Sequence, residues 1–291
     1  KYANARTMHF LLKGLLELSQ KCADLNIPVI VTQRNPLDYF QEEKDSIHSI
    51  ITEQATLRAM RSLQKEVKEY SQTHQIQFLR LNTSCVVPVE IASDKCEYAA
   101  RTFRPKIMSK YQSFLTASNP LEPLQQALQK HFNEDDFEVI YDFYRNKSPL
   151  PIDWLNPGEN AANEQLALFI NKGLDHYHLR NEVEREASSY LSAYLHYGMI
   201  SPRKVIREVL QTNHINATAF IEQTLVRREL AENYCFYQAH YDSLQGAWNW
   251  AQSTLKNHEN DNREVLYTLD QLENSQTIDP LWNQCQDEVR E

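Results

Sequence analysis

The sequence predicts an α/β region followed by an all-α region. Apolar runs typical of strands alternate with helical periodicity in the first hundred residues, whereas the sequence after residue 156 is helical in pattern throughout. The stretch between them is crowded with prolines: Pro105, Pro120, Pro123, Pro149 and Pro151. We therefore predict an α/β domain at residues 1–104, a connector at 105–155 and a helical domain at 156–291.

The α/β domain is predicted from alternating elements. Leucines on one helical face at residues 8–18 precede a short apolar run at 26–32, which is typical of a buried strand. A second cycle follows, with a strand at 47–52, a helix at 57–70 and a strand at 76–81. Strands separated by helices predict a doubly wound parallel sheet. Because the chain opens on a helix, we expect the first strand–helix–strand of this sheet to be missing.

Local signals place the later helices. Leu121, Leu124 and Leu128 predict one short helix inside the connector. Ser201-Pro202 and Asp279-Pro280 each combine a residue suited to the N-cap with a proline suited to the first helical turn, so we expect a helix to begin at each proline.

Composition excludes several classes of protein. Only 5 of the 291 residues are glycine, and no glycine-rich phosphate loop occurs, so a bound nucleotide would need other groups around its phosphates. Five widely spaced cysteines without a C-x-x-C pair argue against a disulfide framework or a zinc site, and we expect no metal. The net charge of −9 gives no global nucleic-acid signature, and no apolar run is long enough to span a membrane.

Three segments could contribute to a functional site. The segment at residues 93–106 holds four cations, for which a solvated surface turn is the favoured interpretation. The serine cluster at 188–192 offers hydroxyls and backbone N–H groups to an anion, although an ordinary helix cap is commoner. At residues 220–237, Gln223 and Arg227 share a predicted helix face, and an apolar stripe beside them is interpreted as core: Val226, Leu230, Tyr234 and Tyr237.

Several of these runs occur together in the order of a known family. Residues 92–107, 157–159, 191–198, 226–235 and 279–283 resemble class II cyclobutane-pyrimidine-dimer DNA photolyases, of the photolyase/cryptochrome family. The resemblance covers nearly the whole chain. It implies an α/β antenna domain with a deazaflavin or folate chromophore, followed by a helical domain that binds FAD. It also implies a DNA-repair lyase, in which light-excited reduced flavin transfers an electron to a dimer flipped out of UV-damaged DNA.

The resemblance also assigns residues by position. It implies FAD contacts from Tyr177, Arg180 and a serine-containing loop made of Ser188, Ser189, Tyr190, Leu191 and Ser192. Gln223 falls where the family has a glutamate that hydrogen-bonds the dimer, and Trp282 matches a tryptophan that conducts electrons to the flavin. The expected DNA contacts are Arg101, Arg104, Arg227 and Arg228.

The chain also departs from the family pattern. Gln223 replaces the glutamate, Ala193 a usual proline and Tyr190 a small residue. We expect the natural photolyase to extend beyond both ends of this sequence, and this length to bind FAD weakly. Two alternatives stay open, a cryptochrome-like flavin photoreceptor and a flavin-free remnant that acts as a scaffold. We further expect an intracellular monomer, cytoplasmic or, in a eukaryote, in the nucleus or an organelle.

Overall fold

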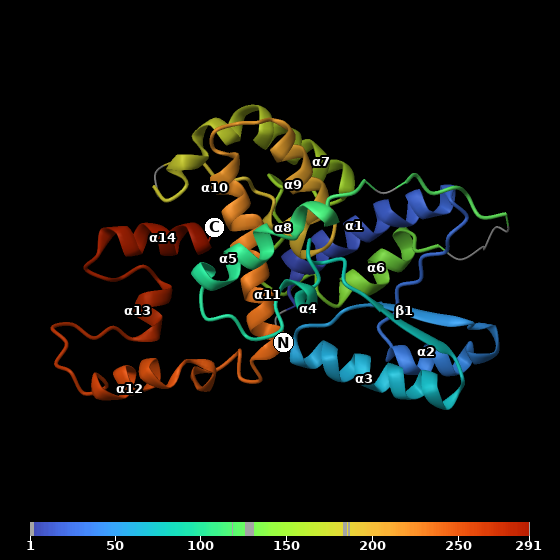
Figure 1. Ribbon diagram of the computed structural model, residues 1–291, viewed down its shortest axis with the longest axis horizontal. Helices are drawn as coiled ribbons and strands as arrows, with labels where there is room; N and C mark the ends of the chain where they lie inside the picture. The colour runs from blue at the N-terminus through green and yellow to red at the C-terminus, as the bar shows by residue number, and fades with distance from the viewer. Residues whose placement is uncertain (1–2, 118, 126–130, 183–184, 186, 291) are drawn as a thin grey trace. The chain divides into compact units, whose positions relative to one another are not determined.

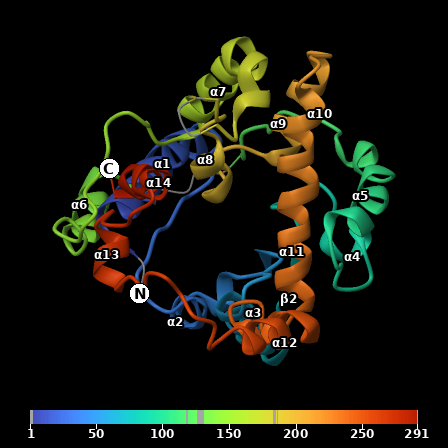
Figure 2. The ribbon, with the colours of Figure 1, turned by 90° about the vertical axis from the view of Figure 1, so that its left-hand side faces the viewer.

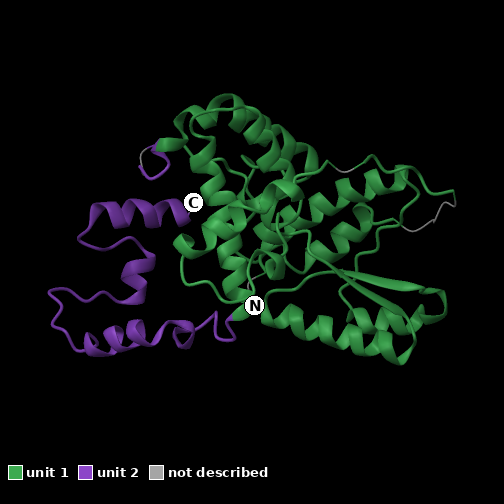
Figure 3. Cartoon of the chain, viewed as in Figure 1, with its two compact units in different colours: residues 1–178, 187–237 green, residues 179–186, 238–291 purple. Residues whose placement is uncertain are grey.

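The computed structural model describes residues 3–117, 119–125, 131–182, 185 and 187–290. The chain divides into two compact units (Figure 3). The first unit comprises residues 1–178 and 187–237, and the second comprises residues 179–186 and 238–291. Among the described residues, no helix has both the length and the apolar character needed to cross a bilayer.

The first unit is mostly helical (Figure 1). Its strands are β1 (Ser49–Glu53) and β2 (Gln77–Leu81). Its helices, in chain order, are α1 (Ala5–Asp24), α2 (Pro36–Glu42), α3 (Arg58–Thr73), α4 (Val89–Ala92), α5 (Ala100–Met108), α6 (Glu134–Asp142), α7 (Glu159–Leu168), α8 (Ser192–His196), α9 (Pro202–Gln211), α10 (Ala217–Ile221) and α11 (Arg228–Tyr237). The second unit contains α12 (Asn249–Asn257), α13 (Leu269–Glu273) and α14 (Pro280–Arg290).

The strand–helix–strand cycle in the middle of the predicted α/β domain is confirmed. β1 and β2 are parallel, with Ser49 opposite Gln77 and Glu53 opposite Leu81. The helix α3 forms the crossover connection that two parallel strands require. Its Val67 packs against Ile50 in a small hydrophobic cluster. The structure thus contains a small parallel sheet, of two strands among the described residues.

The strand predicted at residues 26–32 is wrong. Only Val29 forms a β-bridge, to His131, and Ile30 is 41% exposed. Pro28 lies in this run and has no backbone N–H to donate to a ladder, so the apolar pattern is not matched by continuous pairing. The helix predicted in the connector is also absent from its described part, residues 119–125. Leu121 and Leu124 lie there in exposed, non-helical chain. Leu128 lies outside the described residues.

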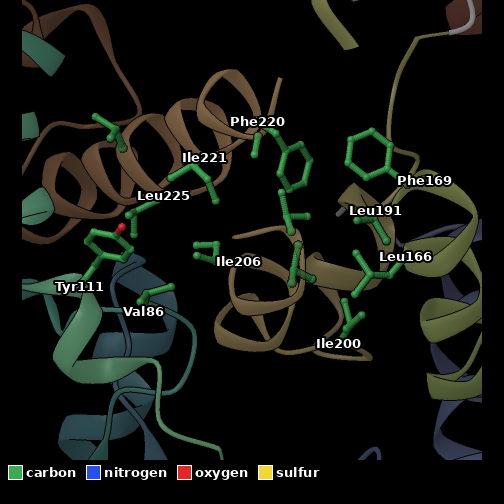
Figure 4. Packing of buried hydrophobic residues seen from close by; sticks show 14 of the residues in the cluster. Val86, Tyr111, Leu166, Phe169, Leu191, Ile200, Ile206, Phe220, Ile221 and Leu225 are labelled. Atoms are coloured by element: carbon green, nitrogen blue, oxygen red, sulfur yellow. The ribbon is translucent and has the colours of Figure 1, made fainter. Parts of the chain in front are cut away.

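The main core lies around α9, α10 and α11 (Figure 4). Ile206 of α9 and Leu225 are fully buried there, together with Val86 from the loop after β2. This core combines residues from both sides of positions 104 and 155, and the three-part domain division stays a prediction. A second cluster joins α1 to α6, in which Leu12 and Leu16 pack with Phe137.

The predicted helix starts at Pro202 and Pro280 are confirmed. The α9 helix begins at Pro202 and buries Val205, Ile206 and Val209 on one face. The α14 helix begins at Pro280, where Asp279 Oδ1 accepts hydrogen bonds from the backbone N–H groups of Leu281 (2.9 Å) and Trp282 (3.2 Å). Each helix start is determined by two adjacent residues, a capping residue and the proline after it, so the sequence alone is enough to locate it.

Candidate functional site

One long helical rod forms a wall of the candidate site. α10 continues through a π-helical segment, Glu222–Arg227, into α11 (Figure 2). In a π-helix the backbone N–H bonds to the carbonyl five residues earlier, so the register of side chains shifts relative to an α-helix, and such segments are frequent at functional sites. The segment is fixed by its burial, because Thr224, Leu225 and Val226 all point into the protein.

A cavity of about 460 Å³ lies against this rod, within the first unit. Its lining comes from the loop after β2, the segment before residue 178, the serine segment with α8, and the rod itself. The lining residues are Ser84, Tyr177, Ser189, Ser192, Leu195, His196, Phe220, Gln223, Thr224, Arg228 and Glu232. The residues predicted from sequence that meet here are Tyr177, Ser189, Ser192, Gln223 and Arg228.

The π-helical register corrects the prediction that Gln223 and Arg227 act from one face. Gln223 lines the cavity with Arg228, five residues later, whereas Arg227 is absent from the lining and contacts Glu222. The prediction from sequence periodicity assumes 3.6 residues per turn, and no residue in this run indicates the wider π-helical turn.

The serine segment contributes fewer side chains than predicted. Leu191 is 1% exposed and belongs to the main core, while Ser188 is exposed and outside the cavity lining. Tyr190 adopts a left-handed backbone with φ of 55°, and its ring packs edge-on against Trp154, with ring centroids 5.9 Å apart. From this segment the cavity therefore receives the hydroxyls of Ser189 and Ser192, and the Ser189 carbonyl accepts a hydrogen bond from the Gln165 side-chain amide at 2.9 Å.

Aromatic packing holds Tyr177 at the cavity. Its buried ring packs edge-on against Phe169 and Phe220, with centroid distances of 5.6 and 5.3 Å. Arg180 and Trp282 belong to the second unit, where Trp282 lies in the first turn of α14 with 46% of its surface exposed. The flavin and electron-transfer roles of these two residues stay predictions.

Arg228 presents an unsatisfied cation. Its Nη1 atom is buried, and no described residue accepts a hydrogen bond from it. A buried donor without an acceptor costs free energy, so an anionic or carbonyl oxygen bound in the cavity would be favoured. Near it, Glu232 also lines the cavity and accepts a hydrogen bond from Thr56 Oγ1 at 2.8 Å. The donor set therefore suits a ligand that carries a phosphate or another oxyanion.

Three polar side chains on one face of α11 fasten the loop and segment beside the cavity. Glu229 accepts hydrogen bonds from the backbone N–H groups of Val86 and Val87. Asn233 bonds the backbone of Lys95 and Glu97, and Tyr237 donates to the Ser93 carbonyl. Because these residues are spaced four apart, they follow one helix face as a ladder. The sequence analysis missed this ladder and interpreted the same stretch only by its apolar residues.

Burial makes Glu229 an unusual carboxyl group. Desolvation raises its pKa to about 7, and the two backbone hydrogen bonds only partly offset this effect. The same environment raises the pKa of the neighbouring Cys85 thiol, first through burial and then through the charge of Glu229.

In the loop after β2, backbone N–H groups donate hydrogen bonds to side chains of the protein itself. Glu53, the last residue of β1, accepts hydrogen bonds from the N–H groups of Thr83 (2.9 Å) and Ser84 (3.0 Å). Asn82 Oδ1 accepts from the N–H of Cys85 at 3.1 Å, and Glu229 takes the next two amides. Five consecutive N–H groups are thus satisfied internally, which fixes the position of Ser84 in the cavity wall.

The predicted DNA-contacting arginines have different surroundings. Arg101 is exposed on α5, whereas Arg104 and Arg227 both bind the carboxylate of Glu222. Lys106, from the same cationic segment, binds Glu97 and Ser93, and this network lowers the pKa of Glu97 to about 2 despite its burial. The surface-turn interpretation therefore holds for neither Arg104 nor Lys106, which make specific ion pairs.

Comparisons with known proteins bear on the whole chain. A sequence model of the DNA photolyase family matches residues 1–127. The chain is 36% identical to a deoxyribodipyrimidine photo-lyase of Arabidopsis thaliana, in an alignment covering 99% of this chain and 61% of that protein. It is 34% identical to one of Potorous tridactylus, covering 98% and 54% respectively. The chain is thus similar to deoxyribodipyrimidine photo-lyases along nearly its whole length.

A solved photolyase supports the fold. A bacterial class III photolyase from Agrobacterium tumefaciens superposes with a TM-score of 0.62 at 15% identity, covering 97% of this chain and 60% of that chain. The chain spans about 54–61% of the length of the two curated relatives named above. The family resemblance found from motifs is therefore confirmed, and its class II subdivision stays a prediction.

Proposed function

We propose that this chain carries the flavin and substrate region of a class II photolyase that repairs cyclobutane pyrimidine dimers in UV-damaged DNA. The observation that supports this most is the cavity, in which Tyr177, Ser189, Ser192 and Gln223 meet beside the unsatisfied Arg228 Nη1. The relatives named above are deoxyribodipyrimidine photo-lyases, and their alignments cover nearly all of this chain.

The side chains of the cavity fit FAD. Arg228 would bind a diphosphate oxygen through Nη1, and the Ser189 and Ser192 hydroxyls would donate to the same group. Tyr177, held by its two phenylalanine contacts, would offer an aromatic surface to the cofactor. FAD, when bound and reduced, supplies the light-driven electron transfer that opens the dimer.

Gln223 would orient the dimer bases. Its amide both donates and accepts hydrogen bonds, so it can recognise the carbonyl and N–H edges of thymine. An amide cannot readily give up a proton, and a step stabilised by proton transfer from a carboxyl group would be lost. We therefore expect Gln223→Glu to leave dimer affinity similar and to raise the repair yield per absorbed photon.

The cofactor assignment is tested by flavin titration. Fluorescence quenching would give the Kd of FAD and of riboflavin, which lacks phosphate, for wild type, Arg228→Met and the exposed-arginine control Arg80→Met. Arg228→Met should weaken FAD binding at least about tenfold, as expected for one charged hydrogen bond, and leave riboflavin binding unchanged. Equal losses for both flavins would refute a diphosphate contact.

Repair is tested separately, by anaerobic illumination of a dimer-containing oligonucleotide with blue light. Loss of dimers in the presence of the protein containing this chain would support the proposal. A cryptochrome-like photoreceptor is the second candidate, favoured by the amide at Gln223 in place of the family glutamate. Absence of repair in the wild type, with repair restored by Gln223→Glu, would establish that candidate instead.

A further inference from the structure

Glu222 binds two arginines that lie 123 residues apart in sequence, at 104 and 227. Arg104 of α5 donates from Nε (2.8 Å) and Nη2 (2.7 Å) to the two carboxylate oxygens, which is a bidentate pair. Arg227 donates from Nε to one of the same oxygens at 3.2 Å. The two guanidinium groups lower the pKa of Glu222, Arg104 being the larger cause, so this carboxylate is ionised at neutral pH.

Both arginines keep unused donors. The side chains of Arg104 and Arg227 are 43% and 57% exposed, whereas that of Glu222 is 23% exposed. Among the described residues, nothing binds Nη1 of Arg104 or the terminal nitrogens of Arg227. The carboxylate is therefore the less exposed member of the cluster, and free N–H donors remain on the two more exposed guanidinium groups.

The cluster is adjacent in sequence to the cavity residues. Glu222 immediately precedes Gln223, and Arg227 immediately precedes Arg228, so each residue of the π-helical segment that joins the ion cluster is followed by a residue of the cavity lining. The bidentate pair also ties α5 to this segment, beside which α5 lies in Figure 2.

We propose that Glu222 is a positioning residue, which holds Arg104 and Arg227 together as a prearranged site for a phosphate of the DNA strand that carries the dimer. This inference rests on the proposed function. Long arginine side chains lose considerable rotamer freedom when a ligand immobilises them, and a carboxylate that already holds them removes part of that cost. The residue thus favours binding in one register even though its own charge repels DNA.

A purely electrostatic role makes the opposite prediction. If Glu222 only neutralised positive charge, its removal would strengthen binding to any DNA, damaged or undamaged. If it positions the arginines, its removal should lower the preference for dimer-containing DNA over undamaged DNA. Glu222→Asp separates these roles, because the charge is kept while the shorter side chain cannot reach both guanidinium groups as before.

The experiment measures the Kd of one duplex, with and without a dimer, for wild type, Glu222→Gln, Glu222→Asp and the control Glu138→Gln. Glu138 is an exposed carboxylate on α6 that pairs with Arg145. We expect the dimer preference to fall about tenfold in both Glu222 variants, the size of one well-placed contact, and to stay unchanged in the control. In an Arg104→Gln background, the same Glu222 change should have little further effect, because the two residues act through each other.

A measurement without DNA makes the outcome independent of the proposed function. Amide hydrogen exchange at residues 100–108 should become faster in the Glu222 variants and not in the control, with melting curves to verify folding. An unchanged dimer preference in Glu222→Asp, or unchanged exchange in α5, would overturn the positioning role. A wild type that shows no dimer preference would refute the proposed function, while the exchange result would still decide whether Glu222 holds α5.

Discussion

Replacing Glu229 by glutamine should remove a pH dependence from the stability of the protein. This carboxyl group is 2% exposed and accepts hydrogen bonds from two adjacent amides, of which that from Val87 is 3.2 Å long. Burial raises its pKa from an ordinary 4.5 to about 7, so that ionising it costs more in the folded protein than in the unfolded chain. Glutamine has the shape of the protonated acid and cannot ionise.

The sign and size follow from proton linkage. A pKa that is higher in the folded state gives a stabilising contribution that is complete below about pH 4.5 and is lost as the pH rises through 7. The shift corresponds to about 3 kcal/mol in total, of which about 2–3 kcal/mol falls between pH 5 and pH 8. The free energy of unfolding of Glu229→Gln, minus that of wild type, should therefore rise by this amount over that range.

Urea denaturation at several pH values between 5 and 8 measures this difference directly. Glu69→Gln on α3 is the control and should give a flat difference, because the Glu69 side chain is 62% exposed and pairs on the surface with Lys65. A flat difference for Glu229→Gln would mean that the two amide hydrogen bonds fully offset desolvation. A falling difference would mean that they exceed it, and either result refutes the reasoning.

Three further predictions follow from single contacts. Lys106→Gln removes the cation that binds Glu97 and should raise the pKa of Glu97 from about 2 toward 4.5, so that acid unfolding begins at a higher pH; an NMR titration of the carboxyl would measure this. Tyr190→Gly should change the free energy of unfolding by less than about 1 kcal/mol in urea titrations, because relief of the strained φ of 55° is offset by loss of the ring contact with Trp154 and by the freedom of glycine in the unfolded chain. Asp279→Ala should destabilise the start of α14 by about 1 kcal/mol, seen as faster amide exchange at residues 280–285.

Sequence reasoning succeeded where the cause of a structure is local. Pro202 and Pro280 begin helices for reasons contained in two adjacent residues, and the β1–α3–β2 cycle follows from periodicity within about thirty residues. It failed at residues 26–32, because the apolar pattern of a strand says nothing about whether a partner strand is available. Five of the eleven cavity-lining residues were assigned by motif position, since hydroxyls such as Ser189 have no distinctive local pattern.

The missed residues share a physical reason. Glu229 and Asn233 look in sequence like the polar face of a solvated helix, yet both are buried, because their partners at residues 86–97 lie more than 130 residues earlier. The π-helical register of Gln223 is likewise set by the packing of Leu225 and Val226 in the core and not by a residue preference. Tertiary contacts of this kind could be predicted only with knowledge of what packs against the helix.

The loop after β2 differs from a glycine-rich phosphate-binding loop in how its amides are used. A phosphate-binding loop normally leaves consecutive amides free for the ligand, and glycine lets the backbone approach it. In this chain the five successive amides at residues 83–87 are occupied by Glu53, Asn82 and Glu229, so the loop has no free N–H groups to offer. An oxyanion in the cavity would therefore not be bound by these five amides, and Arg228, with its unsatisfied Nη1, is a strong donor in the lining. Glycines at these positions would not create a phosphate site, because the amides already donate hydrogen bonds to side chains of the same chain.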